Sequence, residues 1–267
     1  MLTKEQIQFY KENGYIKLSN IFTEKELQEI SDEYDDLFER KQKENAELQA
    51  VWKGEEMKKA CDIQNDVVLS IHNLQFHSIV FTRLILNNNL MDAMEDIMGT
   101  PNILLHHTKA HLKPPHKGAP FLVHQDYHYF PFKNHSMVAA FVNLDDSNPE
   151  NGGLAVYPGS HKLGPLEDFS GEETGGKYHY VDPKKYPIEN ATPINAKRGD
   201  VIVFSYLLLH GSYVNKSERT RRMFLLQLMA AEDEPVNPKH LSPAQGLVLR
   251  GRNVHRDANL STRHIKL

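Results

Sequence analysis

The chain has 267 residues, of which 40% are hydrophobic, and a formal net charge of −4 at pH 7. This length can bury one sizeable core, and we expect a single domain over residues 1–267. The slightly acidic balance disfavours nucleic acid and anionic membranes as partners, because both select basic surfaces. Cys61 is the only cysteine, so an internal disulfide is excluded. With no apolar leader and no run of about 18 apolar residues, we expect a cytoplasmic protein.

Residues 1–100 are expected to be mostly helical. Capping boxes, in which Ser or Thr is followed three residues later by Glu or Gln, mark two helix starts, and glycines mark two helix ends. The expected elements are a helix from Thr3 to Gly14, a strand at 15–18, a long helix from Thr23, a polar helix end or loop at 40–60, and a helix at 79–98 that ends at Gly99.

From residue 102 onward, short β-like runs alternate with turn signals. The expected strands are 102–113, 120–128, 136–144, 153–157, 200–210 and 221–231. Helices followed by many strands indicate an α+β protein that is mainly β, with a double-sheet barrel or jelly roll as its body. We therefore expect a helical flank at 1–100, a jelly-roll core at 101–235 and a C-terminal tail at 236–267. The long polar segment 162–195 is typical of a lid or binding loop.

A candidate metal site begins at His124-Gln125-Asp126. Positions two apart on a strand point to the same side, so the imidazole and the carboxylate would face one cavity. A further histidine would complete a two-His, one-carboxylate set, which leaves positions open on iron(II) for a bidentate cosubstrate and dioxygen. His210, which closes an apolar run, is the candidate, although a buried and hydrogen-bonded histidine is the alternative. A His-x-Asp pair should arise by chance about once in a chain this rich in both residues, so the context carries the prediction.

Arg221 opens the next expected strand, on the same face as Met223, Leu225, Gln227 and Met229. An arginine on an apolar inner face needs an anionic partner. The distal carboxylate of 2-oxoglutarate would supply one, and Arg binds such a group in a bidentate manner that Lys does not match. The alternative is a surface arginine at a fraying strand end.

Several motifs together resemble the phytanoyl-CoA dioxygenase family. They are Phe9–Tyr15, His124–Phe132, Asn148–Gly153, Pro158–His161, and His210–Ser217 continuing to Arg221. The resemblance covers nearly the whole chain. It implies a double-stranded β-helix, a cupin-like jelly roll with flanking N-terminal helices. It also implies iron(II), 2-oxoglutarate and O2 as cofactors, with ascorbate as a useful addition in vitro.

The resemblance also assigns roles to residues at matching positions. The expected iron ligands are His124, Asp126 and His210, and the expected cosubstrate contacts are Arg221, Ser212, Gln125, His72 and Phe141. Gln125 would lie beside the metal. His72 and Phe141 depart from the family, since some members have a lysine and a tryptophan near these positions.

The expected reaction is hydroxylation of a small, polar or anionic metabolite, with release of succinate and CO2. Cations and tyrosines on the expected pocket face suggest this substrate class, although lysines are more often solvated. The candidate substrate contacts are Lys109, His111, Tyr127 and Tyr129. The alternatives are desaturation, cyclisation or epimerisation at the same metal, a catalytically silent jelly-roll binding protein, and a zinc or manganese cupin. We expect a monomer or homodimer with no nucleic-acid or membrane partner.

Overall fold

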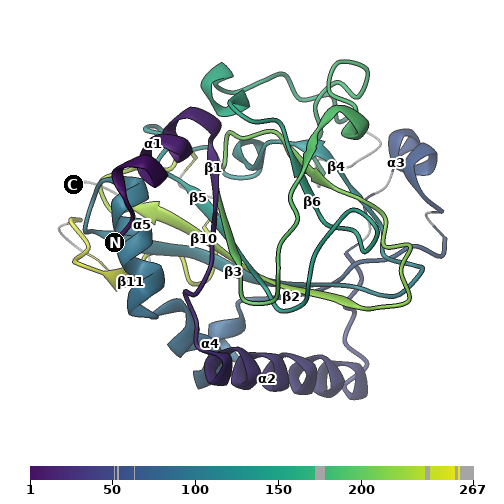
Figure 1. Ribbon diagram of the computed structural model, residues 1–267, viewed down its shortest axis with the longest axis horizontal. Helices are drawn as coiled ribbons and strands as arrows, with labels where there is room; N and C mark the ends of the chain where they lie inside the picture. Colours follow the sequence, from purple (N-terminus) through teal and green to yellow (C-terminus); the bar gives the residue numbers. More distant parts are fainter. Residues whose placement is uncertain are drawn as a thin grey trace.

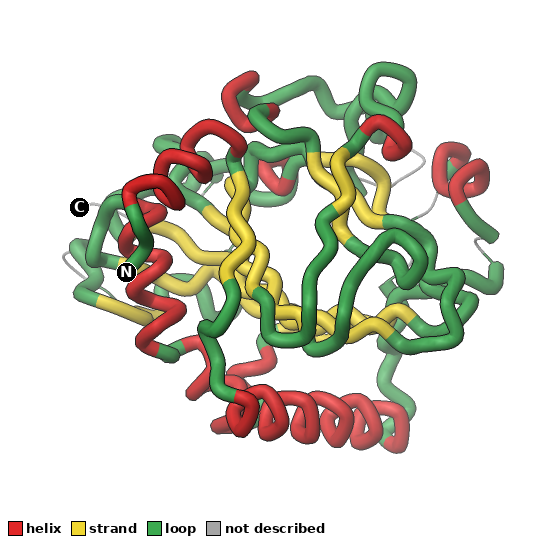
Figure 2. The backbone as a smooth tube through the Cα atoms, in the orientation of Figure 1, coloured by secondary structure: helices red, strands yellow, loops and turns green. Residues whose placement is uncertain are grey.

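The computed structural model describes residues 1–50, 52, 54–62, 64–171, 178–237, 241–255 and 258. Two mainly antiparallel sheets face each other and form a jelly roll, and helices cover the outer side of the larger sheet (Figures 1 and 2). The larger sheet has the order β1 (Tyr15–Leu18), β8 (Val201–Ser205), β5 (Val138–Asn143), β10 (Arg221–Ala230), β3 (Ile103–Lys113) and β11 (Leu247–Arg250), and β2 (Leu69–His72) also pairs with β3. The smaller sheet has the order β4 (Phe121–His124), β9 (His210–Ser212), β6 (Leu154–Val156) and β7 (Thr192–Pro193). The predicted jelly roll with flanking helices is confirmed.

Both predicted capping boxes are present. They open α1 (Lys4–Asn13) and α2 (Glu24–Lys43). Gly14 ends α1 with a positive φ of 77°, a conformation that glycine adopts without a steric penalty. Beyond α2, the polar segment 40–60 contains a further short helix, α3 (Glu55–Ala60).

The expectation of one helix over 79–98 is wrong, because the chain forms α4 (Ile79–Ile85) and α5 (Asn88–Met98) instead. The break follows from Asn87, whose side chain accepts a hydrogen bond of 3.1 Å from the backbone N–H of Leu90. An asparagine that caps a new helix in this way competes with continuation of the previous one. The end of α5 at Gly99 is as predicted.

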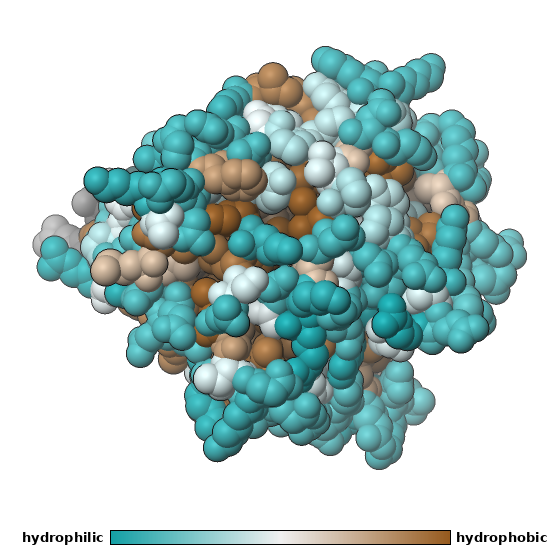
Figure 3. All heavy atoms as spheres, viewed as in Figure 1, coloured by the Kyte–Doolittle hydropathy of each residue, from teal (hydrophilic) through white to brown (hydrophobic). Residues whose placement is uncertain are grey.

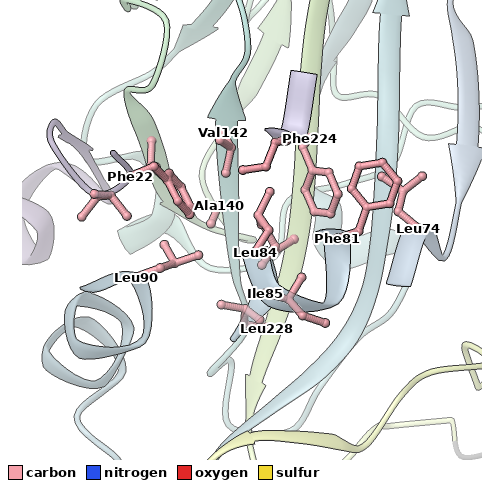
Figure 4. Close-up of a cluster of buried hydrophobic side chains, with 14 of the residues drawn as sticks. Phe22, Leu74, Phe81, Leu84, Ile85, Leu90, Ala140, Val142, Phe224 and Leu228 are labelled. Atoms are coloured by element: carbon pink, nitrogen blue, oxygen red, sulfur yellow. The ribbon is translucent and has the colours of Figure 1, made fainter. Parts of the chain in front are cut away.

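The main core lies between the helices and the larger sheet. Side chains alternate along β10, so that Phe224, Leu226 and Leu228 pack against residues of α4 and α5 such as Leu84 and Leu90 (Figure 4). The opposite side chains of β10 point toward the smaller sheet. The helices therefore anchor one face of the sheet and leave the other face free to form a cavity.

Three other segments differ from expectation. The run at 200–210 is two strands joined by a turn, and the strand at 120–128 ends at His124 before a 3-10 turn (Asp126–His128). Part of the expected C-terminal tail is β11, where Arg250 forms ion pairs with Asp92 at 2.5 Å and Glu95 at 2.6 Å on α5.

Most of the molecular face in Figure 3 is hydrophilic. None of the described helices has both the length and the apolar character needed to cross a membrane.

Candidate metal centre

His124, Asp126 and His210 come together between the two sheets. His124 ends β4 and is paired with His210 at the start of β9, and their ring centroids are 4.2 Å apart. The Oδ1 atom of Asp126 lies 3.6 Å from Nε2 of His124 and 3.7 Å from Nε2 of His210. All three residues are buried, and one potential ligand atom from each lies within 4.8 Å of the others. Asp126 reaches this position from the 3-10 turn, so the prediction that it shares a strand with His124 is wrong, although the two side chains do converge.

The main chain fixes which ring nitrogen of each histidine is free. Nδ1 of His124 lies 2.7 Å from the carbonyl oxygen of Leu122, and Nδ1 of His210 lies 2.9 Å from that of Leu208. A carbonyl oxygen can only accept a hydrogen bond, so Nδ1 carries the proton in both rings. Each Nε2 then offers a lone pair. Burial lowers the pKa of His210 to about 4, which keeps that ring neutral at pH 7.

The carboxylate of Asp126 is also held in place. Gln227, on β10, donates a hydrogen bond of 2.6 Å from Nε2 to Oδ2 of Asp126. Burial opposes ionisation of Asp126, but His210, His124 and this hydrogen bond outweigh it and lower its pKa. Oδ1 is thereby left facing the two histidines.

Two imidazole nitrogens and one carboxylate oxygen are a donor set that suits iron(II) with open positions for other ligands. Each of the three residues also forms a hydrogen bond through the atom that faces away from the other two: the histidines to backbone carbonyls, and Asp126 to Gln227. Hydrogen bonds of this kind orient metal ligands in proteins. The residues present therefore fit the metal.

The triad opens into a cavity of about 260 Å³ between the sheets. Four alternate residues of β10 line it, as the strand pattern predicted: Arg221, Met223, Leu225 and Gln227. Of the residues predicted for cosubstrate or substrate, those that line it are His72, Lys109, His111, Tyr129, Phe141, Ser212 and Arg221.

Arg221 is buried at one end of this cavity, with 4% of its surface exposed. One terminal nitrogen, Nη1, donates a hydrogen bond of 2.6 Å to the carbonyl oxygen of Gly152, while Nε has no partner. No carboxylate of the described residues lies within ion-pair distance of it, and burial lowers its pKa to about 10. A buried guanidinium without an anion is costly, so this end of the cavity favours an anionic ligand.

The remaining predicted contacts differ in their surroundings. The side chain of Lys109 makes no hydrogen bond or ion pair with any described residue, and burial lowers its pKa. Nδ1 of His111 lies 2.8 Å from the hydroxyl of Ser70. The hydroxyl of Tyr129 accepts a hydrogen bond of 3.2 Å from the backbone N–H of His179. Lys109 is thus a cation that faces the cavity with no partner from the part of the chain that is described.

The Gln125 side chain does not face the candidate metal site, contrary to expectation. Its Nε2 donates hydrogen bonds to the carbonyl oxygens of Gly164 at 2.9 Å and Leu207 at 2.6 Å, and its Oε1 accepts one of 2.9 Å from the N–H of Leu166. The side chain is fully buried away from the cavity, because it points to the opposite side of the strand from His124. It anchors the start of the 162–195 segment.

Tyr127 is also outside the lining formed by the described residues. It packs beside Tyr206, with ring centroids 5.7 Å apart, in a small core with Phe132 and Met137. Strand alternation from His124 would place both Tyr127 and Tyr129 away from the candidate metal site, and the 3-10 turn over Asp126–His128 changes the direction of Tyr129 only. Tyr129, two residues later, reaches the cavity instead.

Trp52 and Gln227 are among the cavity residues that received no role from the sequence. Trp52 lies in the polar 40–60 segment, yet its ring packs edge-on to His124, with centroids 5.1 Å apart. As the only tryptophan, standing in a polar stretch, it offered a signal. Gln227 offered another, as the one polar residue within the apolar run that follows Arg222 in β10. The basic residues at 250–256 do not line the cavity where they are described, and Arg256 lies outside the described residues.

Comparison with known proteins agrees with this geometry. The sequence profile of the family described as "Phytanoyl-CoA dioxygenase (PhyH)" matches residues 10–223. The peroxisomal phytanoyl-CoA dioxygenase of Bos taurus is 31% identical over 230 residues, which cover 83% of this chain and 67% of that protein. A probable alpha-ketoglutarate-dependent hypophosphite dioxygenase of Stutzerimonas stutzeri is 28% identical over 239 residues, covering 87% and 80%.

A solved structure shares the fold. The epimerase SnoN, in complex with Fe3+, alpha-ketoglutarate and nogalamycin RO, superposes with a TM-score of 0.68 at 20% identity, over 86% of this chain and 84% of that one. The profile match spans most of the chain and includes all three candidate metal ligands. This chain therefore belongs to the phytanoyl-CoA dioxygenase family of iron(II)- and 2-oxoglutarate-dependent oxygenases.

Proposed function

We propose that this protein hydroxylates a small, polar or anionic metabolite, with His124, Asp126 and His210 as the ligands of iron(II). One observation carries the proposal. The triad opens into the same cavity as Arg221, a buried cation that has no acidic partner among the described residues. A metal site and an anion site that share one cavity are what a chelating dicarboxylate cosubstrate requires.

Arg221 and Ser212 would hold the distal carboxylate of 2-oxoglutarate. Both are buried and line the same end of the cavity, and the guanidinium keeps free N–H groups for a carboxylate. Phe141 and His72 line the walls and would enclose the cosubstrate. Iron(II), 2-oxoglutarate and dioxygen together supply the oxidant for a C–H bond, with succinate and CO2 as coproducts.

On the substrate side, Lys109 supports an anionic group. Its ammonium lines the cavity without a partner from the described residues, and His111 and Tyr129 add polar atoms to the lining of the same cavity. Trp52 and Tyr178, whose ring centroids are 5.5 Å apart, provide an aromatic cover that excludes water. The volume of the cavity restricts the part of the substrate held inside to a small group. A cytoplasmic location and a monomeric or homodimeric state belong to the proposal on sequence grounds alone.

The test is succinate formation by the iron(II)-loaded protein with 2-oxoglutarate and ascorbate, in the presence of pools of amino acids, acyl-CoAs and phosphonates. We expect one pool to stimulate succinate release, and phosphonates or carboxylates to do so better than neutral analogues. His210→Ala should abolish this release, and Arg221→Met should raise the KM for 2-oxoglutarate. His77→Ala and Arg219→Met are matched controls, because neither residue lines the described cavity.

The products separate the alternatives. An added hydroxyl group supports hydroxylation, whereas a new double bond, ring or inverted centre would assign one of the other oxidative outcomes. If the iron(II) protein does not bind 2-oxoglutarate by calorimetry, the oxygenase proposal is wrong and a silent binding protein takes its place. Turnover with zinc or manganese but not with iron would favour a cupin of another class.

A further inference from the structure

Lys113, the last residue of β3, is a buried lysine behind the cavity wall. Only 1% of its surface is exposed, and it is not among the described residues that line the cavity. Its Nζ donates hydrogen bonds to the hydroxyl of Ser212 at 2.7 Å and to the carbonyl oxygen of Tyr213 at 2.6 Å. Neither bond needs a full ammonium charge, since a neutral amine also has two N–H groups.

The surrounding backbone leaves room for this side chain. A Cβ at Gly118 would lie 2.7 Å from Cβ of Lys113, and a Cβ at Gly152 would lie 2.8 Å from its Cδ. Gly152 also has a positive φ of 81°, and its carbonyl accepts the hydrogen bond from Arg221. The Asn151-Gly152-Gly153 turn therefore leaves room for the Lys113 side chain and also accepts a hydrogen bond from Arg221.

The hydrogen bonds of Ser212 determine where its proton points. Its Oγ accepts from Nζ of Lys113 and, at 3.1 Å, from the backbone N–H of Phe121. A hydroxyl has two acceptor positions and one donor, so both acceptor positions are filled. The remaining O–H must point elsewhere, and Ser212 lines the cavity at the end where Arg221 lies.

Two basic residues are neighbours in the sheet. Arg221 on β10 is paired with Lys113 on β3, and both side chains are buried. No carboxylate of the described residues forms an ion pair with either of them. The buried Arg221 guanidinium, with a second basic side chain beside it and no acidic partner, favours an anionic ligand at this end.

We propose that Lys113 is a positioning residue for the distal carboxylate of 2-oxoglutarate: by filling an acceptor position of Ser212, it turns the Ser212 hydroxyl into a donor toward the carboxylate that Arg221 binds. This inference rests on the proposed function, because it assumes that 2-oxoglutarate occupies the cavity. Lys113 does not contact the carboxylate in this proposal, and it acts only by orienting the hydroxyl of Ser212.

The experiment is anaerobic calorimetry of 2-oxoglutarate binding to the iron(II)-loaded protein, repeated with succinate, which lacks the keto group needed for chelation. The variants are Lys113→Met, Ser212→Ala and the double variant, with Lys117→Met as control on an exposed lysine nearby. Each single variant should weaken binding of both diacids about 10- to 100-fold, the range for one hydrogen bond to a charged group. The double variant should lose no more than about twofold beyond either single one, since the residues act in series. In steady state, the KM for 2-oxoglutarate should rise while kcat at saturation stays close to wild type.

Additive losses in the double variant, or normal binding by Lys113→Met, would overturn the inference and leave the oxygenase proposal intact. If the wild-type protein itself does not bind 2-oxoglutarate, both fall together. Thermal unfolding checks that each variant folds. Should Lys113→Met not fold, Lys113→Gln replaces it, because the shorter amide keeps a donor but does not reach Ser212, and the same loss is expected. If neither folds, normal binding by Ser212→Ala overturns the inference, and weakened binding supports it.

Discussion

Gln227→Met should separate metal affinity from stability. The side chain is 1% exposed, and its Nε2 donates to Oδ2 of Asp126 at 2.6 Å. Its Oε1 is buried with no hydrogen-bond partner. Methionine has a similar length and volume, so the substitution removes one good hydrogen bond and one unsatisfied oxygen together.

These two changes act in opposite directions on the free energy of unfolding. A hydrogen bond to a charged group contributes about 1.5–3 kcal/mol, and a buried unsatisfied polar atom costs about 1–3 kcal/mol. Since they nearly cancel, the metal-free Gln227→Met protein should unfold within about 1 kcal/mol of wild type. The metal behaves differently, because the carboxylate of Asp126 is then free to rotate. Loss of such an outer partner typically costs about 10- to 100-fold in metal affinity.

The assay is a titration with iron(II) or cobalt(II), with urea unfolding of the metal-free proteins in parallel. Gln75→Met is the matched control. Gln75 also has one hydrogen bond through its side chain, from Thr108 at 2.6 Å, and one buried amide nitrogen without a partner, but it contacts no metal ligand. Unchanged metal affinity in Gln227→Met would refute the role of Gln227 in orienting Asp126. A large loss of stability would refute the cancellation.

Three further predictions follow from single positions. Trp52 is the only tryptophan and lies against His124, one of the proposed metal ligands, so cobalt(II) should quench most of the intrinsic fluorescence. Undiminished emission at saturating metal would contradict the site. Gly152→Ala should destabilise by about 1–3 kcal/mol more than Gly99→Ala in urea unfolding, because both have positive φ but only Gly152 meets the Lys113 side chain. Burial raises the pKa of Cys61 from 9.0 to about 11. Alkylation by iodoacetamide at pH 8 should therefore be about 100-fold slower than that of free cysteine, and the rate should rise about tenfold per pH unit. A rate like that of free cysteine would refute the raised pKa.

Local chemistry accounts for the features that the sequence predicted well. The capping boxes at Thr3 and Thr23 depend on residues three apart, and the inner face of β10 depends on alternation within one strand. Both rules need only neighbours in the chain. The order of helices and short strands indicated a barrel or jelly roll, and the family resemblance narrowed this to a double-stranded β-helix.

The sequence alone did not place residues 125–129 correctly. Alternation from His124 puts Gln125 and Tyr127 on the side away from the candidate metal site, and the structure places both there. The turn at Asp126–His128, which no strand pattern predicts, brings Tyr129 to the cavity. Trp52 could not be placed either, because it reaches the metal site from a segment whose own pattern is polar.

The cosubstrate end of the cavity depends on strand register, which no single strand encodes. β10 and β3 pair regularly from Arg221 opposite Lys113 to Gln227 opposite His107, and only beyond that point does a bulge pass over His106. A slip of one residue in β3 would place Leu112 beside Arg221 and turn Lys113 to the other face of the sheet. The hydrogen bond to Ser212 would then be lost, although every residue of the motif would still be present. The bulge lies beyond Gln227, so the segment of β10 and β3 that lies behind the cavity keeps one register. The anion site therefore depends on the pairing between two strands more than a hundred residues apart. The Lys113 and Ser212 double variant tests the side-chain contact that this register makes possible.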